Sequence, residues 1–191
     1  MKHLTHDEHV KLHAAEQAAE AQTSARLVLA VVPLSDRYAL YPIIYGALAG
    51  LLLLGLLALL LPDLTLRDGF FATAIAFFVV SLVLEWPPLK LLIVPKKVKH
   101  HHAREMAHRV FAARILAQAD KKPGIALFAA LGERTVEIVA DRDVHSRVPQ
   151  SVWDAIIADF SDFARKGRAV DGLLAAAETC TKVLEEHYPA K

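Results

Sequence analysis

The sequence predicts an α/β (α+β) domain, in which helices cover a small mixed sheet, interrupted by a transmembrane α-helical hairpin. Two apolar runs, residues 40–61 and 70–94, lie in the middle of the 191-residue chain. The segments on either side alternate between helical and strand-like patterns, and neither is expected to fold alone, because the first has a single strand and the second lacks the strand that would lie beside its own. We therefore predict a membrane segment over residues 39–97 that separates two parts of one domain, residues 1–38 and 98–191.

The overall composition gives no indication of a nucleic acid partner. The formal net charge is +1 and aromatic residues make up 7% of the chain, so we expect neither a basic field nor a stacking platform. The single cysteine, Cys180, excludes an intramolecular disulfide. It lies in a helical pattern, where we expect a small buried residue and not a nucleophile.

The first part of the domain predicts one helix and one strand. Thr5 and Glu8 form a capping-box pattern, so a helix begins there and runs to about Gln22. We expect no removable apolar leader in this polar segment. The apolar run of residues 27–32 has the length of a strand, and its continuous apolar character is typical of a central strand covered on both faces.

The middle of the chain predicts two membrane-spanning helices. A spanning helix needs about 20 apolar residues, and residues 40–61 satisfy this without a charged side chain. Residues 62–69 form a polar link, and the return helix begins at Phe70 and ends near Glu85. We expect the rest of the second apolar run to lie along the membrane interface.

The distribution of Lys and Arg predicts the orientation. Arg67 is the only positive side chain in the polar link. The other end of the two helices carries a set of them: Arg37, Lys90, Lys96, Lys97, Lys99 and Arg104. By the positive-inside rule, we expect the domain to face the cytoplasm and the protein to be a multi-pass membrane protein. We expect Lys96, Lys97 and Lys99 to bind anionic lipid headgroups, at about 1 kcal/mol each.

Small residues in both apolar runs predict close helix packing. Gly46 and Gly50 are four residues apart in the first run, and Ala72 and Ala76 offer a similar face in the second. Two interpretations stay open at this point. These faces pack the two helices against each other, or they pack against a second copy or another membrane protein.

The second part of the domain predicts two strands and further helices. The expected elements are a helix over residues 99–119, a strand over 125–131, a strand over 135–140, a loop over 141–147, and helices ending at Gly167 and His187. The last two strands are joined by a tight turn, so we expect them to pair antiparallel. The long connection between the first two strands allows them to be parallel neighbours.

Several spaced motifs resemble a known family. Residues 124–143 are similar to the strand–turn–strand signature of the TPM domain family. Other segments fit its pattern: Val148-Pro149, Trp153, His187-Tyr188-Pro189, Ala19-Glu20, Thr23-Ser24 and Ser35–Tyr38. The resemblance implies a TPM-like fold in a bacterial membrane branch of the family. Family members include photosystem II repair factors, receptor accessory proteins, and proteins described as acid phosphatases or calcium binders.

Three aspartates are the candidate metal ligands. Asp36 follows the first strand, and Asp141 and Asp143 follow the third, so we expect them to meet at the carboxyl ends of neighbouring strands. Three carboxylates suit a hard cation such as calcium or magnesium, which can activate water for hydrolysis. The alternative is a loop held by ion pairs between these aspartates and nearby arginines: Arg37, Arg142 and Arg147.

Two functions follow from these features. The first is a non-enzymatic accessory or assembly factor for a membrane complex, in contact with lipids and with another integral membrane protein or a second copy. The alternative is a metal-dependent, phosphatase-like hydrolase that uses Asp36, Asp141 and Asp143. Apart from that cation we expect no cofactor. The glycine-rich loop of many soluble family members is replaced here by residues 141–145, which puts inherited hydrolysis in question.

Overall fold

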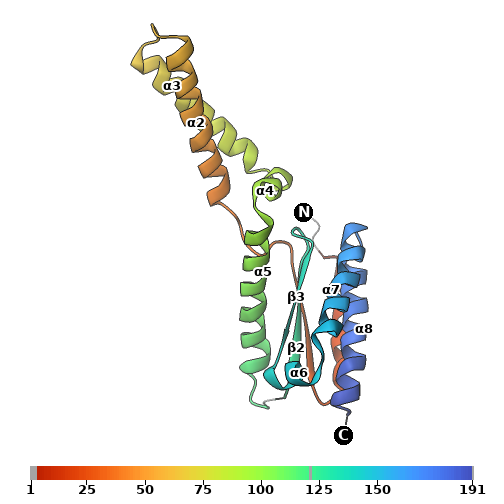
Figure 1. The fold of residues 1–191 in the computed structure, drawn as a ribbon. Coiled ribbons are helices and arrows are strands. Elements are labelled where there is room, and N and C mark those ends of the chain that lie inside the picture. Colours follow the sequence, from red (N-terminus) through yellow and green to blue (C-terminus); the bar gives the residue numbers. More distant parts are fainter. Residues whose placement is uncertain (1–3, 121, 191) are drawn as a thin grey trace. The chain divides into compact units, whose positions relative to one another are not determined.

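The computed structural model describes residues 4–120 and 122–190, and the chain forms two compact units. One unit, the sheet domain, consists of the residues up to Asp36 together with those from Lys97 onward. The other, the hairpin unit, is the continuous segment Arg37–Lys96 that lies between them in sequence. Figure 1 shows the elements of both units in their order along the chain.

The sheet domain contains the strands β1 (Arg26–Val32), β2 (Gly124–Ala130) and β3 (Thr135–Ala140), in the order β1-β2-β3. β1 and β2 are parallel, with Leu29 opposite Leu127, and β2 and β3 are antiparallel. The predicted parallel neighbours and the predicted antiparallel pair are both confirmed.

The position of β1 differs from the prediction. We expected a central strand, but β1 lies at one edge of the sheet and β2 lies in the centre. Apolar cores lie on both faces of β1, so its side chains from Leu27 to Val32 are all apolar although no described strand pairs with its outer edge. β2 is buried along its whole length, which is the pattern of a central strand.

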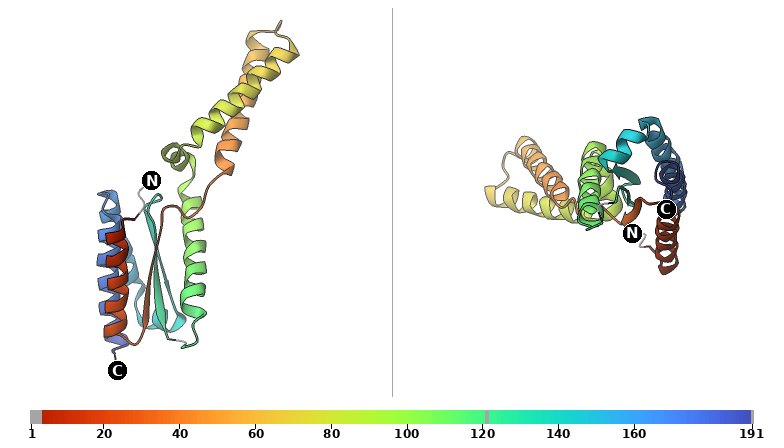
Figure 2. Two further views of the ribbon diagram at one scale, coloured as in Figure 1. Left: turned by 180° about the vertical axis from the view of Figure 1, so that it is seen from behind. Right: turned by 90° about the horizontal axis from the view of Figure 1, so that it is seen from below.

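Helices cover both faces of the sheet, as Figures 1 and 2 show. One face is covered by α1 (His6–Gln22), α7 (Gln150–Arg165) and α8 (Ala169–His187), and the other by α5 (Lys96–Phe111) and its π-helical extension η1 (Ala112–Leu116). The predicted capping box at Thr5 begins α1. The predicted helix over residues 99–119 begins and ends three residues earlier than expected.

Two apolar cores lie on the two faces of the sheet. On the α7 and α8 side, the core contains Leu127 and Phe160, each at most 1% exposed. On the α5 side, it contains Phe128 with Ala103 and Ala107, all fully buried. The alanines of α5 allow this helix to lie close to the strands, because they put little bulk between helix and sheet.

The segment after β3 is a short helix and not the predicted loop. In α6 (Arg142–Arg147), the N–H of His145 donates a hydrogen bond to the backbone oxygen of Asp141 (2.8 Å). Val144 is fully buried and is the only apolar residue of this helix. One apolar position gives no periodicity, which explains why the sequence did not indicate a helix here.

The hairpin unit contains α2 (Leu40–Leu60), α3 (Leu66–Leu84) and α4 (Pro87–Ile93). α3 begins four residues before the predicted start at Phe70 because Thr65 caps it. The N–H of Asp68 donates a hydrogen bond to Thr65 Oγ1 (3.3 Å), which satisfies one of the free donors of the first turn.

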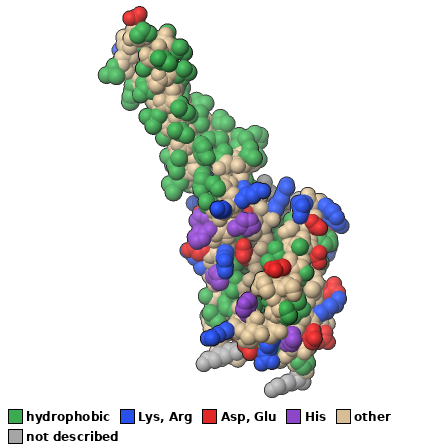
Figure 3. Space-filling view, viewed as in Figure 1, with side chains coloured by type: hydrophobic (Ala, Val, Ile, Leu, Met, Phe, Trp, Pro, Cys, Tyr) green, Lys and Arg blue, Asp and Glu red, His purple; other side chains and the backbone are tan. Residues whose placement is uncertain are grey.

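α2 and α3, with 21 and 19 residues, are long and apolar enough to cross a membrane. Only 11% and 6% of their most apolar segments are buried within the structure. The core helix of a soluble protein would be mostly buried, so the outward surface of these helices requires another covering. Figure 3 shows hydrophobic side chains over the hairpin and charged side chains at its tip.

Candidate functional site

The predicted metal ligands lie at opposite ends of the sheet. Asp36 follows the end of β1, whereas Asp141 and Asp143 follow the end of β3. β1 is parallel to β2 and β3 is antiparallel to it, so these ends are separated by the length of a strand, about 20 Å. The prediction that the three carboxylates meet is wrong, because it treated the two strands as pointing the same way.

Metal binding itself stays a prediction. Among the described residues, no group of three or more His, Cys, Asp or Glu side chains is placed to hold a metal ion.

Asp143 connects α6 to the end of the chain. The Tyr188 hydroxyl donates a hydrogen bond to Asp143 Oδ2 (2.6 Å), and Arg147 Nε donates one to Oδ1 (3.3 Å). The bond from Tyr188, with help from Arg147, holds the pKa of Asp143 below its ordinary value. Desolvation and the neighbouring carboxylate raise the pKa of Tyr188 to about 12. The alternative of an Asp–Arg contact is thus confirmed for Asp143 and Arg147.

Asp36 lies in a shallow hollow of about 250 Å³ between the segment after β1 and α5. His102 Nδ1 is 3.5 Å from Asp36 Oδ2. The neighbouring Ser35 donates its backbone N–H and its hydroxyl to Glu133 Oε1, each at 2.8 Å. These hydrogen bonds connect the segment after β1 to the turn between β2 and β3, so the side chains at this end of the sheet hold the fold together.

The predicted glycines of the hairpin pack against α3. A Cβ at Gly46 would collide with Ser81 Oγ, and one at Gly50 would lie 3.2 Å from the methyl group of Thr73. Both glycines are buried, and the Ser81 hydroxyl donates a hydrogen bond to the Pro42 carbonyl oxygen (3.3 Å). Of the two interpretations of these glycines, the structure shows packing within the hairpin.

Three residues of α3 face the glycines of α2. Thr73, Phe77 and Ser81, spaced four residues apart, supply the atoms nearest to Gly46 and Gly50. Residues with a hydroxyl are small enough for such close approach. Ala72 and Ala76 are partly buried, as these three residues are, and their part in helix packing stays a prediction.

The hairpin unit holds a buried lysine that the sequence did not reveal. Lys90 Nζ forms an ion pair with Glu85 and donates a hydrogen bond to the Arg37 carbonyl oxygen (3.3 Å), and the residue is 8% exposed. A buried ammonium group needs such partners because its desolvation is costly. Lys90 is therefore engaged within the unit and is not one of the free surface charges.

The predicted headgroup ligands lie in the first turn of α5. Lys96 and Lys97 are exposed, and Lys99 is partly buried. The first turn of α5 contains no acidic side chain. Positive charges at a helix N-terminus are unfavourable because the helix dipole is positive there, so an anion at this turn would be stabilised.

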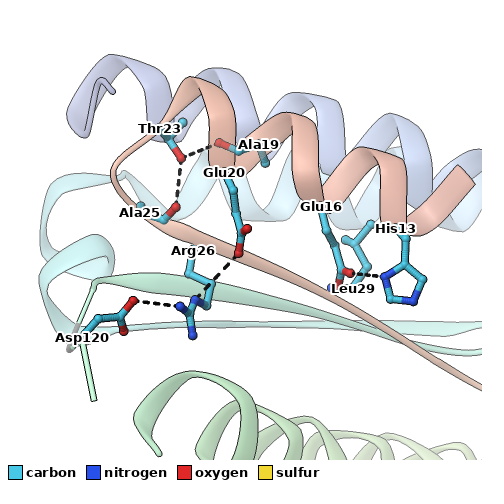
Figure 4. A network of polar contacts seen from close by, with 9 residues as sticks. All are labelled: His13, Glu16, Ala19, Glu20, Thr23, Ala25, Arg26, Leu29 and Asp120. Carbon is cyan, nitrogen blue, oxygen red and sulfur yellow. Dashed lines mark hydrogen bonds and ion pairs between the residues drawn. The ribbon is translucent and has the colours of Figure 1, made fainter. Parts of the chain in front are cut away.

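A carboxylate occupies the outer edge of β1. The Leu29 N–H donates a hydrogen bond to Glu16 Oε1 (2.7 Å), and His13 Nδ1 lies 3.1 Å from Glu16 Oε2 (Figure 4). At the start of the strand, Arg26 pairs with Asp120 (2.8 Å). The Glu16 side chain of α1 thus accepts a hydrogen bond from a backbone N–H that an incoming strand would otherwise use.

The outer edge of β3 is lined by a groove of about 300 Å³. Its walls come from α5, α6 and α7, and Glu137 to Ala140 of β3 form its floor. Desolvation raises the pKa of Glu137, although His100 Nδ1, 3.9 Å from its Oε1, and Arg104 act in the opposite direction. The groove had no signal in the sequence, because it depends on which strand lies at the edge.

Cys180 is fully buried in α8, as predicted. Burial raises the pKa of its thiol to about 12. A nucleophilic cysteine needs a thiolate, so Cys180 is a packing residue at neutral pH.

Comparisons with known proteins identify the family. Residues 89–183 match the family model of the TPM domain, which spans α5 to α7, both later strands and most of α8. The match leaves out α1 and β1, to which the resemblance of the sequence also extended. The comparison with curated proteins gave no match.

Among solved structures, the chain is similar to the NMR structure of the BA42 protein from the psychrophilic bacterium Bizionia argentinensis. The two share 15% sequence identity with a TM-score of 0.56, over 100% of this chain and 87% of that one. At this identity the similarity concerns the fold alone, and it confirms the predicted α+β class. Residues 89–183 of this chain form a TPM domain.

Proposed function

We propose that the protein spans the inner membrane of a bacterium through α2 and α3, with its TPM domain in the cytoplasm, and acts as an accessory or assembly factor for a membrane protein complex. The supporting observation is the apolar outer surface of the hairpin. Leu59, Leu82 and Phe78 are 79%, 77% and 68% exposed. Such a surface is covered by lipid or by the helices of a partner, because its contact with water is unfavourable.

The proposed orientation rests on the positive side chains. Arg67 lies in the first turn of α3, next to the link between α2 and α3, whereas Lys96, Lys97 and Lys99 follow the hairpin and begin α5. The positive-inside rule then puts the TPM domain in the cytoplasm. Anionic headgroups would offset the repulsion between the three lysines and the helix dipole, which supports the proposed lipid contact.

The accessory role is preferred to hydrolysis because of where the carboxylates lie. Asp36 and Asp141 are at opposite ends of the sheet, and Asp143 is engaged by Tyr188 and Arg147. The hydrolase alternative required all three at one site. The hairpin, by contrast, packs Gly46 and Gly50 internally and presents long apolar side chains outward, which suits contact with other transmembrane helices.

Reporter fusions test the orientation. A fluorescent protein fused to the C-terminus should fluoresce, because it folds in the cytoplasm. Alkaline phosphatase inserted within residues 63–68 should be active, because it needs the oxidising periplasm to form its disulfides. An active phosphatase at the C-terminus, with an inactive one in the link, would overturn the cytoplasmic placement.

Crosslinking in native membranes tests the accessory role. A photoreactive phenylalanine analogue at Leu59 or Phe78 samples the outer surface of the hairpin, and the same analogue at Asp63, in the polar link, is the control. We expect the two outward positions to join the same integral membrane protein, and the control to join none. Adducts with lipid alone from both outward positions would contradict the accessory role.

A further inference from the structure

The outer edge of β3 presents unpaired backbone groups. The N–H of Asp141 donates a hydrogen bond to the Gly124 carbonyl oxygen (2.9 Å), which extends the β2–β3 ladder by one bonded pair. Antiparallel neighbours alternate between bonded and non-bonded pairs. Val136, Ile138 and Ala140 are therefore the residues whose N–H and C=O groups point away from β2. In Figure 1 the sheet is seen from this edge, with α5 on one side and α7 on the other.

The two edges of the sheet differ in protection. On β1, the Glu16 carboxylate takes up the N–H of Leu29. Within the described residues, no side chain makes an equivalent bond to Val136, Ile138 or Ala140 of β3. Proteins commonly protect an edge strand against the addition of another strand, so an edge that is left open beside a groove indicates a binding surface.

The α7 wall of the groove is apolar. Ile138 and Ala140 pack against the core on this side, and Trp153 and Ile157 of α7 complete the wall. Trp153 is 4% exposed, and its indole N–H has no hydrogen-bond acceptor among the described residues. A buried donor without an acceptor is unfavourable, so a bound group that supplies an oxygen at this wall would be stabilised.

The α5 wall is polar and carries positive charge. Arg104 and His108 are exposed on it, and His145 of α6 also lines the groove. Glu137 of β3 is the single carboxylate of the groove lining, and it is paired with His100. Arg104 carries the fixed positive charge of this lining, and the imidazoles of His108 and His145 offer hydrogen-bond donors beside it, which favours carboxylates on this side.

We propose that the outer edge of β3 binds an extended segment of a protein partner as an additional strand, with apolar side chains toward α7 and acidic side chains toward α5. Successive side chains of a strand point to opposite faces, so alternating apolar and acidic residues match both walls at once. The inference rests on the proposed function in one respect, since it gives the accessory factor a means of holding its partner. Purified protein tests it independently of membrane topology.

A labelled peptide tests the binding directly. The probe is fluorescein-labelled Val-Glu-Ile-Glu-Val-Glu with a C-terminal amide, added to the full-length protein in detergent micelles and followed by fluorescence anisotropy. We expect saturable binding, and at least about tenfold weaker binding of a peptide with Lys in place of Glu. In a Trp86→Phe background, Trp153 is the one remaining tryptophan, and its emission should shift as the peptide binds.

Two N-methylated peptides distinguish strand addition from charge attraction. Methyl groups on the apolar residues and methyl groups on the Glu residues point to opposite edges of the extended peptide, because backbone N–H groups alternate in direction. The peptide whose methyl groups lie on the edge that faces β3 should not bind. The peptide methylated on the other edge should bind with a Kd within about threefold of that of the parent peptide. If both methylated peptides bind like the parent, no strand is added and the proposal is wrong.

Two arginine variants locate the site. Arg104→Glu should weaken binding of the Glu peptide at least about tenfold and improve binding of the Lys peptide. Arg114→Glu is the matched control, because Arg114 is an exposed arginine beside the outer edge of β1, where Glu16 occupies the Leu29 N–H. It should leave the Kd nearly unchanged. Equal losses in both variants would show non-specific attraction and overturn the proposal.

Amide hydrogen exchange identifies the occupant. The amides of Val136, Ile138 and Ala140 should become protected when the peptide is added. Protection that instead rises with protein concentration, without peptide, would show that a second copy takes the edge and would overturn the proposal. If the peptides do not bind but the reporter fusions give the expected pattern, only the proposal for the edge of β3 is wrong. If the peptides bind but the fusion pattern is reversed, only the proposed membrane topology is wrong.

Discussion

Glu16 shows how a single side chain connects a helix to the edge of a sheet. It lies on α1, its side chain is 17% exposed, and it accepts the N–H of Leu29 at 2.7 Å. A hydrogen bond to a charged acceptor in a partly buried position is stronger than a neutral one. In the sequence Glu16 resembles the other acidic residues of α1. Its role depends on how α1 docks on β1, and helical periodicity does not contain this information.

Replacing Glu16 with Ala should lower the free energy of unfolding by about 1–3 kcal/mol, because the Leu29 N–H would lose its acceptor. Glu16→Gln keeps an oxygen acceptor and should cost less. Glu20→Ala is the control, since the Glu20 side chain is 56% exposed and its change should stay within about 0.5 kcal/mol. Thermal unfolding in detergent, followed by circular dichroism, measures all three. A Glu16→Ala variant that melts like the unmodified protein would contradict the role assigned to this bond.

The candidate aspartates show which contacts a sequence reveals. Asp143 and Arg147 are four residues apart, so their ion pair could be anticipated from helical spacing once α6 is recognised. Tyr188, the other partner of Asp143, is 45 residues away and has no spacing signal. Asp36 was placed with Asp141 because both follow strands, but the direction of the third strand decides which end each reaches.

At the scale of elements, close contact between α2 and α3 depends on glycine at particular positions. Gly46 and Gly50 face Ser81 and Thr73, and a side chain at Gly46 would have no room. Gly55, on the same helix, has no atom near the position of a Cβ. The pair Gly46 and Gly55 therefore separates the effect of helix contact from the general effect of glycine in a helix.

Gly46→Ala should destabilise the hairpin by about 1–3 kcal/mol, because the added methyl group displaces the Ser81 hydroxyl from its hydrogen bond to Pro42 and lies 3.0 Å from the Phe77 carbonyl oxygen. Gly55→Ala should be neutral or slightly stabilising, because alanine favours the helix and meets nothing. Unfolding in mixed micelles with a rising fraction of sodium dodecyl sulfate, followed by the fluorescence of Trp86 in a Trp153→Phe background, compares them. Equal destabilisation by both substitutions would rule out the assigned helix contact.

The elements themselves could be predicted where a local signal determines them. The capping box of Thr5 and Glu8 correctly began α1, and the alternating pattern of residues 135–140 correctly gave β3. The place of β1 at the edge could not be predicted, because helices on both faces give an edge strand the apolar pattern of a central one. α6 was missed for the opposite reason, since Val144 alone anchors it.

At the scale of the whole molecule, the sheet joins segments that are far apart in sequence. β1 pairs with β2 over seven positions, from Arg26 opposite Gly124 to Val32 opposite Ala130, and the whole hairpin unit lies between them in the chain. The division of the chain at residues 38 and 97 was drawn from the sequence and stays a prediction. It implies that the parts on either side depend on each other for folding.

Joining residues 1–38 to 98–191 through a short flexible linker should give a soluble protein that unfolds cooperatively in urea. Residues 98–191 alone should be poorly folded, because β2 would lose its parallel neighbour and the core on each face would be exposed. Urea titrations followed by far-ultraviolet circular dichroism compare the two proteins. Cooperative unfolding of residues 98–191 with similar stability would show that one domain is not divided by the hairpin.

The arrangement of the strands along the chain also imposes an order in time. β1 leaves the ribosome about 90 residues before β2, and synthesis at about 5–20 residues per second makes this interval about 5–20 s. During this time β1, which is apolar from Leu27 to Val32, has no partner strand, while α2 and α3 emerge. α1 is already present and can shield the edge of β1 through Glu16. On the proposed topology, the hairpin inserts into the membrane before the sheet can form. The two parts of the domain therefore come together while each is already attached to one end of a membrane-inserted hairpin.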